Sequence, residues 1–435
     1  MSATPTEALE IRGGRPLVGA VDVPGDKSIS HRALLLSALA EGISTITGLS
    51  TGDDVTRTRR AVEALGAAVS VDGGRVTVDG GRSRLAAPRD TIDLGNSGTG
   101  MRLLTGVLAT VPGTTHLTGD DSLRSRPMDR VADPLALMGA TVVGEGEHCL
   151  PPLAVTGRSL QGIDYTPPMA SAQVKGSILL AALDAEGETV VREPVATRAH
   201  TEEMLAAAGA DLIVEPWGAG RVVRIRRSGL GARVWDVPGD PSQAAFWVVA
   251  GTVVPGSRVT VDQVHLGAER IGFLHVLIRM GADVTLRDIG GDVGSITASF
   301  SALSGTTVDA SEIPSLDEVP ILAMAALVAD GPTRFRDVGE LRVKESDRLE
   351  GTARLVRAFG GVATVEGDDL VVEGGTTPTP GTVDAEGDHR MAMAAAVAAA
   401  AGPSAELTRI EGWEAVATSY PGFAETLDRL AGGSR

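Results

Sequence analysis

The sequence predicts an α/β protein of two domains, each built from three copies of one unit with two strand–helix pairs and a hairpin. A glycine after a helix often adopts the left-handed conformation that ends it. Such glycines recur 70 to 79 residues apart, at Gly66, Gly139, Gly209, Gly281, Gly360 and Gly432. Strand-like alternation follows, as at 69–71 and 362–365. The sequence Asp-Val-Pro-Gly-Asp occurs at 22–26 and again at 236–240, three units later.

Each unit also contains an earlier and more apolar helix. These helices are expected to begin near Lys27, Ser97, Ala172, Pro241, Asp317 and His389. We expect them to fill each core, with the amphipathic helices covering it. The domains are predicted at 22–237 and at 1–21 plus 238–435, so the N-terminal strand joins the second domain. A ligand is expected in a cleft between the domains, facing the helix starts.

The composition excludes several classes of function. The net charge is -17 and aromatic residues make up 3% of 435 residues, which argues against binding to nucleic acid or to a membrane surface. The single cysteine, Cys149, excludes an internal disulfide and a multi-cysteine metal site, and no other residues have metal-ligand spacing. The first ten residues lack the apolar core of a signal peptide, and the longest apolar run, 391–402, is too short to span a bilayer. We therefore predict a cytoplasmic protein without a membrane segment.

Cations are placed at the start of the first buried helix. Lys27, Ser28 and Arg32 follow a Pro-Gly turn, although a helix N-terminus favours negative charge. Lysine is rare in this chain, occurring only at 27, 175 and 344 among 39 basic residues. An anionic ligand would explain these cations, and a solvated pair of charges on a loop is the alternative.

Other helix starts of the first domain carry weaker signals. The small residues around Gly98 would let a ligand approach backbone N–H groups, although a tight turn explains them equally well. Arg126 stands where an acidic residue is expected, and a surface arginine is the alternative. Ser171 could be a plain N-cap, and Gln173 could simply pack.

The second domain adds carboxylates to the cations. Asp317 is a candidate proton acceptor, with an N-cap of its apolar helix as the alternative. Lys344 and Arg348 would share a face if the segment were helical, with Glu345 as a possible proton carrier, or they could belong to a charged exposed helix. Arg390 opens an almost wholly apolar helix, so we expect a partner or ligand to hold it.

These residues together suit small substrates with several anionic groups and proton transfer at carbon or hydroxyl. The cationic set comprises Lys27, Arg32, Arg126, Arg198, Lys344, Arg348 and Arg390. No dinucleotide or ATP phosphate-loop fingerprint occurs at a suitable strand–helix junction.

Several motifs, in family order along nearly the whole chain, closely resemble the 5-enolpyruvylshikimate-3-phosphate synthases. They lie at 25–32, 94–99, 126–127, 171–173, 342–348 and 388–393. The resemblance implies an inside-out α/β barrel fold with three βαβαββ units in each of two domains. It also implies transfer of the enolpyruvyl group of phosphoenolpyruvate to the 5-hydroxyl of shikimate 3-phosphate, by a monomer that uses no metal or organic cofactor.

The resemblance further implies roles for individual residues. Shikimate 3-phosphate would be bound by Lys27, Ser28, Arg32, Ser171, Ala172, Gln173, Arg198, Asp317 and Lys344. Phosphoenolpyruvate would be bound by Lys27, Gly98, Arg126, Gln173, Arg348 and Arg390. The catalytic residues would be Asp317, Glu345 and Lys27. Asp317 would take the proton of the 5-hydroxyl, and Glu345 and Lys27 would handle the proton at the methylene carbon.

The chain departs from the family pattern at two points. Thr418 stands where many members have a lysine, and Leu103 where many have a proline. Leu103 and the 169–173 segment resemble the second class of the family, of which some members tolerate the inhibitor glyphosate. Gly98 keeps the small residue that leaves room for glyphosate, so we expect the inhibitor to compete with phosphoenolpyruvate.

Two alternative functions stay open at this point. The sister enzyme transfers enolpyruvate to UDP-N-acetylglucosamine, but has Lys-Asn in place of Lys27-Ser28 and often a reactive loop cysteine, whereas Cys149 is predicted to lie in a strand. A non-catalytic protein that binds phosphometabolites is the second alternative, which the presence of Asp317, Glu345 and Lys27 disfavours.

Overall fold

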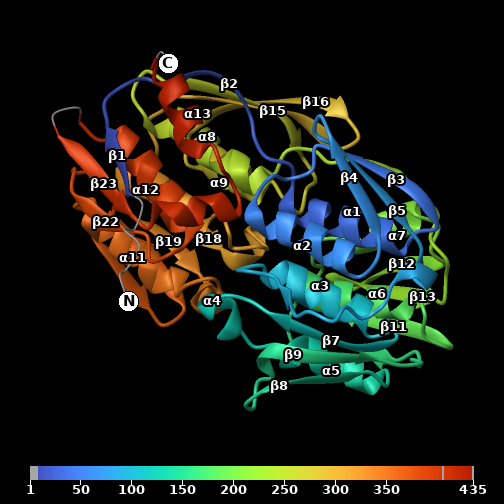
Figure 1. Cartoon of the computed structure of the whole chain (residues 1–435). Helices are drawn as coiled ribbons and strands as arrows, with labels where there is room; N and C mark the ends of the chain where they lie inside the picture. The colour runs from blue at the N-terminus through green and yellow to red at the C-terminus, as the bar shows by residue number, and fades with distance from the viewer. Residues whose placement is uncertain (1–7, 404–405, 434–435) are drawn as a thin grey trace, which may run out of the picture. The chain divides into compact units, whose positions relative to one another are not determined.

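The computed structural model describes residues 8–403 and 406–433 and divides into two compact units (Figure 1). The continuous unit comprises residues Gly25–Val237. The split unit comprises the chain up to Pro24 and from Pro238 onward. Both contain mixed sheets and helices, which confirms the predicted α/β class.

The continuous unit contains three four-stranded sheets of the same design. In each, an edge strand pairs parallel with its neighbour, which is followed by the two antiparallel strands of a hairpin. In sheet order the first is β14 (Val234–Asp236), β3 (Gly42–Thr47), β5 (Arg75–Gly80) and β4 (Ala68–Asp72). The second is β6 (Ile92–Asp93), β7 (Gly113–Thr118), β9 (Leu150–Gly157) and β8 (Thr141–Glu145). The third is β10 (Asp164–Tyr165), β11 (Glu188–Glu193), β13 (Gly220–Arg226) and β12 (Leu212–Trp217).

The split unit repeats this design twice and shortens it once. In sheet order its strands are β16 (Asp283–Gly290), β17 (Val293–Ser299), β15 (Arg258–His265) and β2 (Val18–Asp22); then β18 (Thr307–Asp309), β19 (Thr333–Arg336), β21 (Asp369–Val372) and β20 (Ala363–Glu366). The third sheet has β1 (Ala8–Arg12), β23 (Leu407–Glu411) and β22 (Thr382–Asp384), with β1 antiparallel to β23 where the other sheets have a hairpin. The N-terminal strands therefore complete sheets formed by the C-terminal half of the chain.

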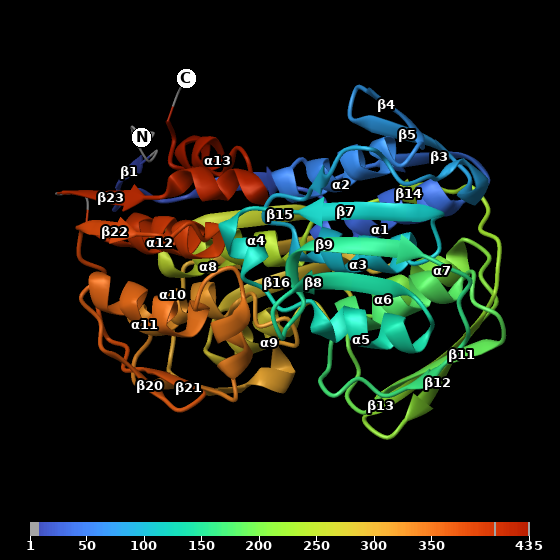
Figure 2. The same ribbon diagram turned by 60° about the horizontal axis from the view of Figure 1, so that its bottom comes forward.

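Three nearly apolar helices fill the core of each unit. They are α1 (Lys27–Leu39), α3 (Gly98–Leu108) and α6 (Ala172–Ala182) in the continuous unit, and α8 (Pro241–Val253), α10 (Val319–Val328) and α12 (His389–Ala401) in the split unit. The helices that follow in each repeat are α2 (Asp53–Ala64), α5 (Asp129–Leu137), α7 (His200–Ala207), α9 (Gly272–Arg279), α11 (Arg348–Ala358) and α13 (Phe423–Leu430), with a short α4 (Asp121–Arg124). Figure 2 shows the sheet of β7, β9 and β8 beside α3 and α5, and both of these helices contact α6.

The predicted helix boundaries agree closely with the structure. Each of the six buried helices begins within two residues of its predicted position. All six glycines that were expected to end helices have positive φ, from 76° at Gly432 to 113° at Gly66. The prediction for Cys149 is wrong, because this residue lies with φ 51° in the turn between β8 and β9. Among the helices of the described ranges, none combines the length and hydrophobicity that crossing a membrane requires.

Where the chain passes from one unit to the other, the strand before each passage is an edge strand of a sheet in the unit that the chain is leaving. β2 precedes α1 in the sequence but pairs parallel with β15, and β14 precedes α8 but pairs parallel with β3. The same Pro-Gly turn follows each of these strands. A Cβ on Gly25 would lie 1.8 Å from the carbonyl oxygen of Gly48, so this turn requires glycine.

Several aromatic residues of the split unit form a cluster at α8. The rings of Trp247 and Phe423 stack with centroids 4.4 Å apart, and Tyr420 meets Phe423 edge-on at 5.3 Å. The Trp247 indole N–H also donates to the Tyr420 hydroxyl at 3.1 Å. This cluster fixes α13 against the core helix α8.

We predict that Phe423→Ala lowers the free energy of unfolding by about 3–5 kcal/mol, because it removes a fully buried ring from this cluster. Urea denaturation followed by circular dichroism measures the change. Phe300→Ala is the matched control, because Phe300 is 49% exposed in the same unit and should change stability by less than about 0.5 kcal/mol. Equal effects of both substitutions would contradict the structural role of the cluster.

Candidate active site

The start of α1 carries the first group of candidate residues. Asp26 caps the helix by accepting a hydrogen bond from the Ile29 amide at 3.0 Å. The Lys27 ammonium pairs with the Asp54 carboxylate of α2 at 2.9 Å, and both side chains are largely buried. The lysine is therefore a held cation, and the solvated-loop alternative is wrong for it.

Arg32 lies one turn further along α1 and is only 3% exposed. Its Nε donates to the Thr201 hydroxyl at 2.7 Å, and its Nη1 donates to the Ser28 carbonyl at 2.9 Å. Arg198 approaches the same residue, with Nη1 donating to the Ser28 hydroxyl at 3.2 Å. The structure thus brings Ser28, Arg32 and Arg198 together at the start of α1.

The starts of α3 and α6 are joined by an arginine that sequence reasoning did not single out. Arg102 donates to the Gln173 side-chain oxygen at 2.7 Å, and the Gln173 amide donates to the Thr99 hydroxyl at 2.7 Å. Gln173 therefore bridges two helix starts and does more than pack. Arg102 lies in α3, three residues after the motif at 94–99, and its sequence position gave no sign of a partner 71 residues away.

The remaining predicted residues of the continuous unit lie at the same helix starts. Arg126 is 6% exposed, and its Nη2 donates to the Asn96 side-chain oxygen at 2.5 Å and to the Ser122 hydroxyl at 3.1 Å. A Cβ on Gly98 would lie 3.0 Å from Arg126 Nη1, so this glycine faces the guanidinium. Ser171 is the N-cap of α6, as its alternative reading stated, and Ala172 is the first helical residue.

His31 connects the first two helix starts from inside the core. Its Nδ1 pairs with the Thr58 hydroxyl at 2.8 Å, and its Nε2 lies 3.5 Å from the hydroxyl of Ser97, the N-cap of α3. Burial, together with the nearby charges of Lys27 and Arg32, lowers the pKa of His31 to about 3. His31 is therefore neutral at physiological pH and holds the two helices without adding charge.

The split unit assembles its candidate residues around Arg348, which is fully buried. Two nitrogens of its guanidinium donate to Asp388, from Nε to Oδ2 at 2.7 Å and from Nη2 to Oδ1 at 3.1 Å. Nη1 donates to Asp317 Oδ1 at 3.1 Å, and Nη2 pairs with Glu345 Oε2 at 2.7 Å. One arginine thus orders three carboxylates. Asp388 binds two nitrogens of the guanidinium at once, although it was not among the predicted site residues.

Asp317 lies among cations just before α10. The N-cap alternative is wrong, because Glu318 is the N-cap residue and no side chain caps this helix. Arg390 Nη2 lies 3.5 Å from Asp317 Oδ2, and Lys344 Nζ lies 4.0 Å from Oδ1. Burial alone would raise the pKa of Asp317, but Arg390, Lys344 and Arg348 hold it well below its usual range. The carboxylate is therefore ionised at neutral pH.

The predicted helical face of Lys344 and Arg348 is wrong. A 3₁₀ segment ends at Val343, and α11 begins only at Arg348, where the Asp347 carboxylate caps it by accepting from the Glu350 amide at 3.1 Å. The extended link instead lets Lys344 reach the Ser315 carbonyl at 3.2 Å, next to Asp317. Both residues meet the same carboxylate from different directions.

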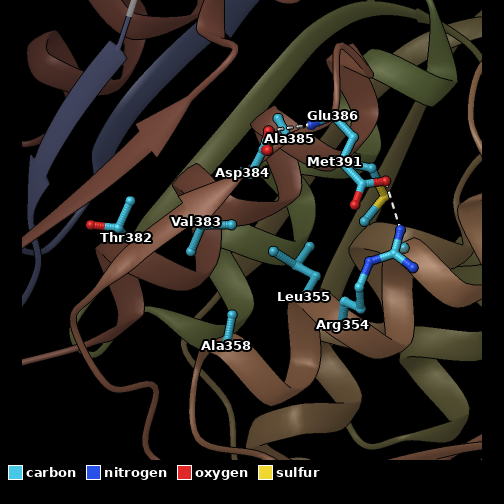
Figure 3. Close-up of a pocket in the computed structure, with 10 residues that line it drawn as sticks. Arg354, Leu355, Ala358, Thr382, Val383, Asp384, Ala385, Glu386 and Met391 are labelled. Atoms are coloured by element: carbon cyan, nitrogen blue, oxygen red, sulfur yellow. Dashed lines mark hydrogen bonds and ion pairs between the residues drawn. The ribbon is translucent and has the colours of Figure 1, made fainter.

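A small separate pocket of the split unit is lined by residues of α11 and of the segment before α12 (Figure 3). It measures about 160 Å³ and lies between α11 and the turn before α12, with Leu355, Val383 and Met391 among its apolar lining residues. Arg354 pairs with Glu386 across its edge at 2.6 Å. This pair ties α11 to the turn that precedes Asp388, so it supports the alignment of the buried ion pair.

Two further features of the described chain bear on the sequence predictions. The Thr418 hydroxyl donates to the Ala415 carbonyl at 2.7 Å within a 3₁₀ turn at Trp413–Thr418, so it completes local structure where many family members have a cation.

Residues 8–403 and 406–433 contain no group of three or more His, Cys, Asp or Glu side chains placed to hold a metal ion.

The comparisons with known proteins agree on one family. Residues 11–427 match the family model described as EPSP synthase (3-phosphoshikimate 1-carboxyvinyltransferase). The 3-phosphoshikimate 1-carboxyvinyltransferase of Caulobacter vibrioides is 47% identical over 434 residues, covering 97% of both chains. That of Rhodospirillum rubrum is 48% identical over 442 residues, covering 98% of this chain and 97% of the relative.

Solved structures give the same result. An EPSP synthase from Acinetobacter baumannii matches with a TM-score of 0.85 and 39% identity, over 98% of both chains. The enolpyruvyl transferase NikO from Streptomyces tendae matches with a TM-score of 0.78 over 98% of both chains. NikO is 22% identical, so this likeness concerns the fold alone.

We predict that His31 makes the protein less stable in acid. The unfolded chain binds a proton on this residue below about pH 6.5, whereas the folded protein does so only near its pKa of about 3. Stability from this group is therefore fully present above pH 6.5 and falls by about 1.4 kcal/mol for each pH unit below it. Urea unfolding of wild type and His31→Gln at several pH values between 7 and 4.5 measures the slope. The wild-type slope should exceed that of the variant, and parallel slopes would contradict the prediction.

Proposed function

The chain belongs to the EPSP synthase family, and from this membership we propose that it transfers the enolpyruvyl group of phosphoenolpyruvate to the 5-hydroxyl of shikimate 3-phosphate. The products are 5-enolpyruvylshikimate 3-phosphate and phosphate, in the shikimate pathway to aromatic amino acids. The observation that best supports this activity is the ionised Asp317 among Lys344, Arg348 and Arg390. A base surrounded by anion-binding groups suits a reaction between two anionic substrates.

Shikimate 3-phosphate is bound mainly by the helix starts of the continuous unit. Ser28 and Arg198 form one contact at the start of α1, with Arg32 beside them, and Lys27 reaches the same turn. Ser171, Ala172 and Gln173 open α6, whose backbone N–H groups favour an anion. The family resemblance also assigns Lys344 and Asp317 to this substrate.

Phosphoenolpyruvate is bound by arginines of both units. Arg348 and Arg390 bind its anionic groups from the split unit, and Arg126 does so from the continuous unit with Gly98, Lys27 and Gln173 nearby. Guanidinium groups suit carboxylate and phosphate because their planar donors can bind two oxygens at once. The buried position of Arg348, Arg390 and Arg126 makes each such contact stronger than it would be in water.

Asp317 accepts the proton of the 5-hydroxyl as that oxygen forms a bond to C2 of phosphoenolpyruvate. In the free protein its pKa is held low by Arg390, Lys344 and Arg348. Binding of substrate anions to these cations competes with the carboxylate, which raises its pKa and strengthens it as a base. The charge cluster thus keeps Asp317 ionised before binding and activates it on binding.

Protonation of the methylene carbon by Glu345 or Lys27 completes the tetrahedral adduct. The adduct then loses a proton from the new methyl group, and the C2–O bond to phosphate breaks. Glu345 lies beside Arg348, and Lys27 lies beside Asp54, so an ion pair holds each of these side chains in place. Positioning and fixed charge account for the catalysis.

The decisive experiment measures phosphate release from phosphoenolpyruvate with either of two acceptors. We expect turnover with shikimate 3-phosphate and none with UDP-N-acetylglucosamine. Turnover only with the sugar nucleotide would assign the protein to the sister reaction. Binding of shikimate 3-phosphate without phosphate release would identify a non-catalytic binding protein. The cytoplasmic location and the monomeric state are predictions from the sequence, and gel filtration measures the latter.

Replacement of the base tests the assignment of Asp317. We predict that Asp317→Asn lowers kcat by about 10²–10⁴-fold, because a positioned general base contributes about that much. Calorimetry should still detect binding of shikimate 3-phosphate. Asp283→Asn is the matched control, because Asp283 is exposed on β16 of the same unit and should leave kcat unchanged. An Asp317→Asn enzyme with wild-type kcat would remove Asp317 from the mechanism.

Inhibition by glyphosate tests the environment of Gly98. We expect glyphosate to compete with phosphoenolpyruvate in the wild type. Gly98→Ala should raise both the inhibition constant and the KM for phosphoenolpyruvate, because the added methyl lies 3.0 Å from Arg126 Nη1 and displaces it. Gly229→Ala is the control, since nothing lies within 4 Å of its added methyl. Inhibition that does not depend on the concentration of phosphoenolpyruvate would contradict the competition.

A further inference from the structure

Lys175 is the one lysine that the substrate assignments leave without a role. It lies on α6, two residues after Gln173, and its side chain is 0% exposed. A buried ammonium is costly unless it is paired and hydrogen-bonded. The chain otherwise uses arginine for nearly all its basic residues, so a lysine in the core of the continuous unit calls for an explanation.

All three N–H donors of the Lys175 ammonium are used. Nζ donates to Glu193 Oε2 at 2.7 Å, to Glu202 Oε1 at 2.7 Å and to the Arg198 backbone carbonyl at 3.2 Å. Arg221 lies near the same carboxylates, at 3.7 Å from Glu193 and 3.4 Å from Glu202. Two cations therefore balance two carboxylates, which are each 2% exposed.

This cluster closes around one irregular segment of the chain. Glu193 is the last residue of β11, and Glu202 lies in the first turn of α7, so Lys175 links the elements on both sides of residues 194–199. It also binds the segment itself through the Arg198 carbonyl. Arg221 adds a second backbone contact, with Nη2 donating to the Thr197 carbonyl at 2.9 Å. The segment is also held by the Ala196 amide, which donates to the Ala219 carbonyl at 3.4 Å, and by the Thr197 hydroxyl, which donates to Glu193 Oε1 at 2.5 Å. Glu193 therefore contacts both Lys175 and the segment.

The residues that the segment presents are those proposed to bind the phosphorylated substrate. The side chain of Arg198 contacts the Ser28 hydroxyl, and Thr201 at the start of α7 accepts from Arg32 Nε. A shift of the segment therefore moves Arg198 and removes the acceptor that orients Arg32. Lys175 can affect both arginines although it is shielded from solvent.

We propose that Lys175 is a positioning residue that sets the affinity for shikimate 3-phosphate by fixing residues 194–199, between β11 and α7, together with residues 200–201 at the start of α7. This inference rests on the proposed function. A lysine suits the position because its compact ammonium directs three donors to three acceptors that lie around a single point, whereas the donors of a guanidinium lie in one plane.

The experiment compares three variants of the full-length protein at a temperature where circular dichroism shows all of them folded. Lys175→Met removes the ammonium but leaves two buried carboxylates. The triple variant K175M/E193Q/E202Q keeps the shapes and removes those charges, so it tests the proposal if the single variant fails to fold. Leu180→Ala is the matched control, because it removes a buried side chain from the same helix. Leu180 takes no part in the hydrogen bonds described above that hold residues 194–201.

Two measurements are made on each protein. Calorimetry gives the dissociation constant of shikimate 3-phosphate, and hydrogen exchange without ligand reports the backbone amides within 194–201, which begin at residue 195 because Pro194 has no N–H. We expect the dissociation constant to rise at least about tenfold and up to about 10²-fold in both Lys175 variants, as small misplacements of binding groups do. Exchange of 194–201 should be faster in the same variants and unchanged in Leu180→Ala. In steady-state kinetics, KM for shikimate 3-phosphate should rise while kcat at saturation changes less than about threefold.

The possible failures are distinguishable. An unchanged dissociation constant in a folded Lys175 variant, unchanged exchange of 194–201, or an equal loss of affinity in Leu180→Ala would overturn the positioning role. A fall in kcat with constant KM would also overturn it. If the wild type does not bind shikimate 3-phosphate, the proposed function is overturned, and the role of Lys175 in affinity is overturned with it. In that case hydrogen exchange would still show whether Lys175 holds the segment in place.

Discussion

The ion pair between Arg348 and Asp388 is the interaction on which the split unit's half of the site depends. Both side chains are buried and joined by two hydrogen bonds, and the same guanidinium orders Asp317 and Glu345. Burial of a charge is tolerated only with such complete pairing. The pair also aligns the starts of α11 and α12, because Asp388 is the N-cap of α12 and Arg348 is the first residue of α11. Folding and charge placement therefore depend on the same contact.

The two units satisfy their cations in different ways. In the split unit carboxylates surround Arg348, Arg390 and Lys344, so substrate anions must compete with protein anions. In the continuous unit Arg32 and Arg126 donate to neutral oxygens of Thr201, Ser122 and backbone or amide groups. Lys27 differs from these arginines, because it pairs with the Asp54 carboxylate at 2.9 Å. In the proposed mechanism, competition between substrate anions and the carboxylates of the split unit couples substrate binding to the basicity of Asp317.

The sequence predicted the features that depend on local pattern and left those that depend on distant contacts undetermined. Helix-ending glycines and apolar runs mark the six buried helices because both signals act within one turn or one face. The repeated Asp-Val-Pro-Gly-Asp sequence predicted that the N-terminal strand joins the second domain. The pairing partners of β2 and β14 have no local signal, since a parallel edge strand of three to five residues fits any neighbour of similar composition. Residues 344–347 looked helical by charge spacing, but the Asp347 cap starts the helix later. The partners of Arg102 and Lys175 lie too far along the chain for spacing to show them.

The start of α8 repeats the sequence at the start of α1, and comparing the two shows which residues the fold requires. At α8 the position of Lys27 is taken by Pro241, and Asp240 accepts from the Ser242 amide at 2.8 Å and from Arg270 at 3.0 Å. The Ser242 hydroxyl donates to Glu318, which also accepts from Ser315 at 2.7 Å. The protein's own side chains thus occupy this copy of the helix start, and they hold the turn that carries Asp317. One ancestral turn therefore presents cations in the continuous unit and supports the proposed base in the split unit, so the Pro-Gly-Asp sequence is explained by folding, and Lys27 and Arg32 are explained by function.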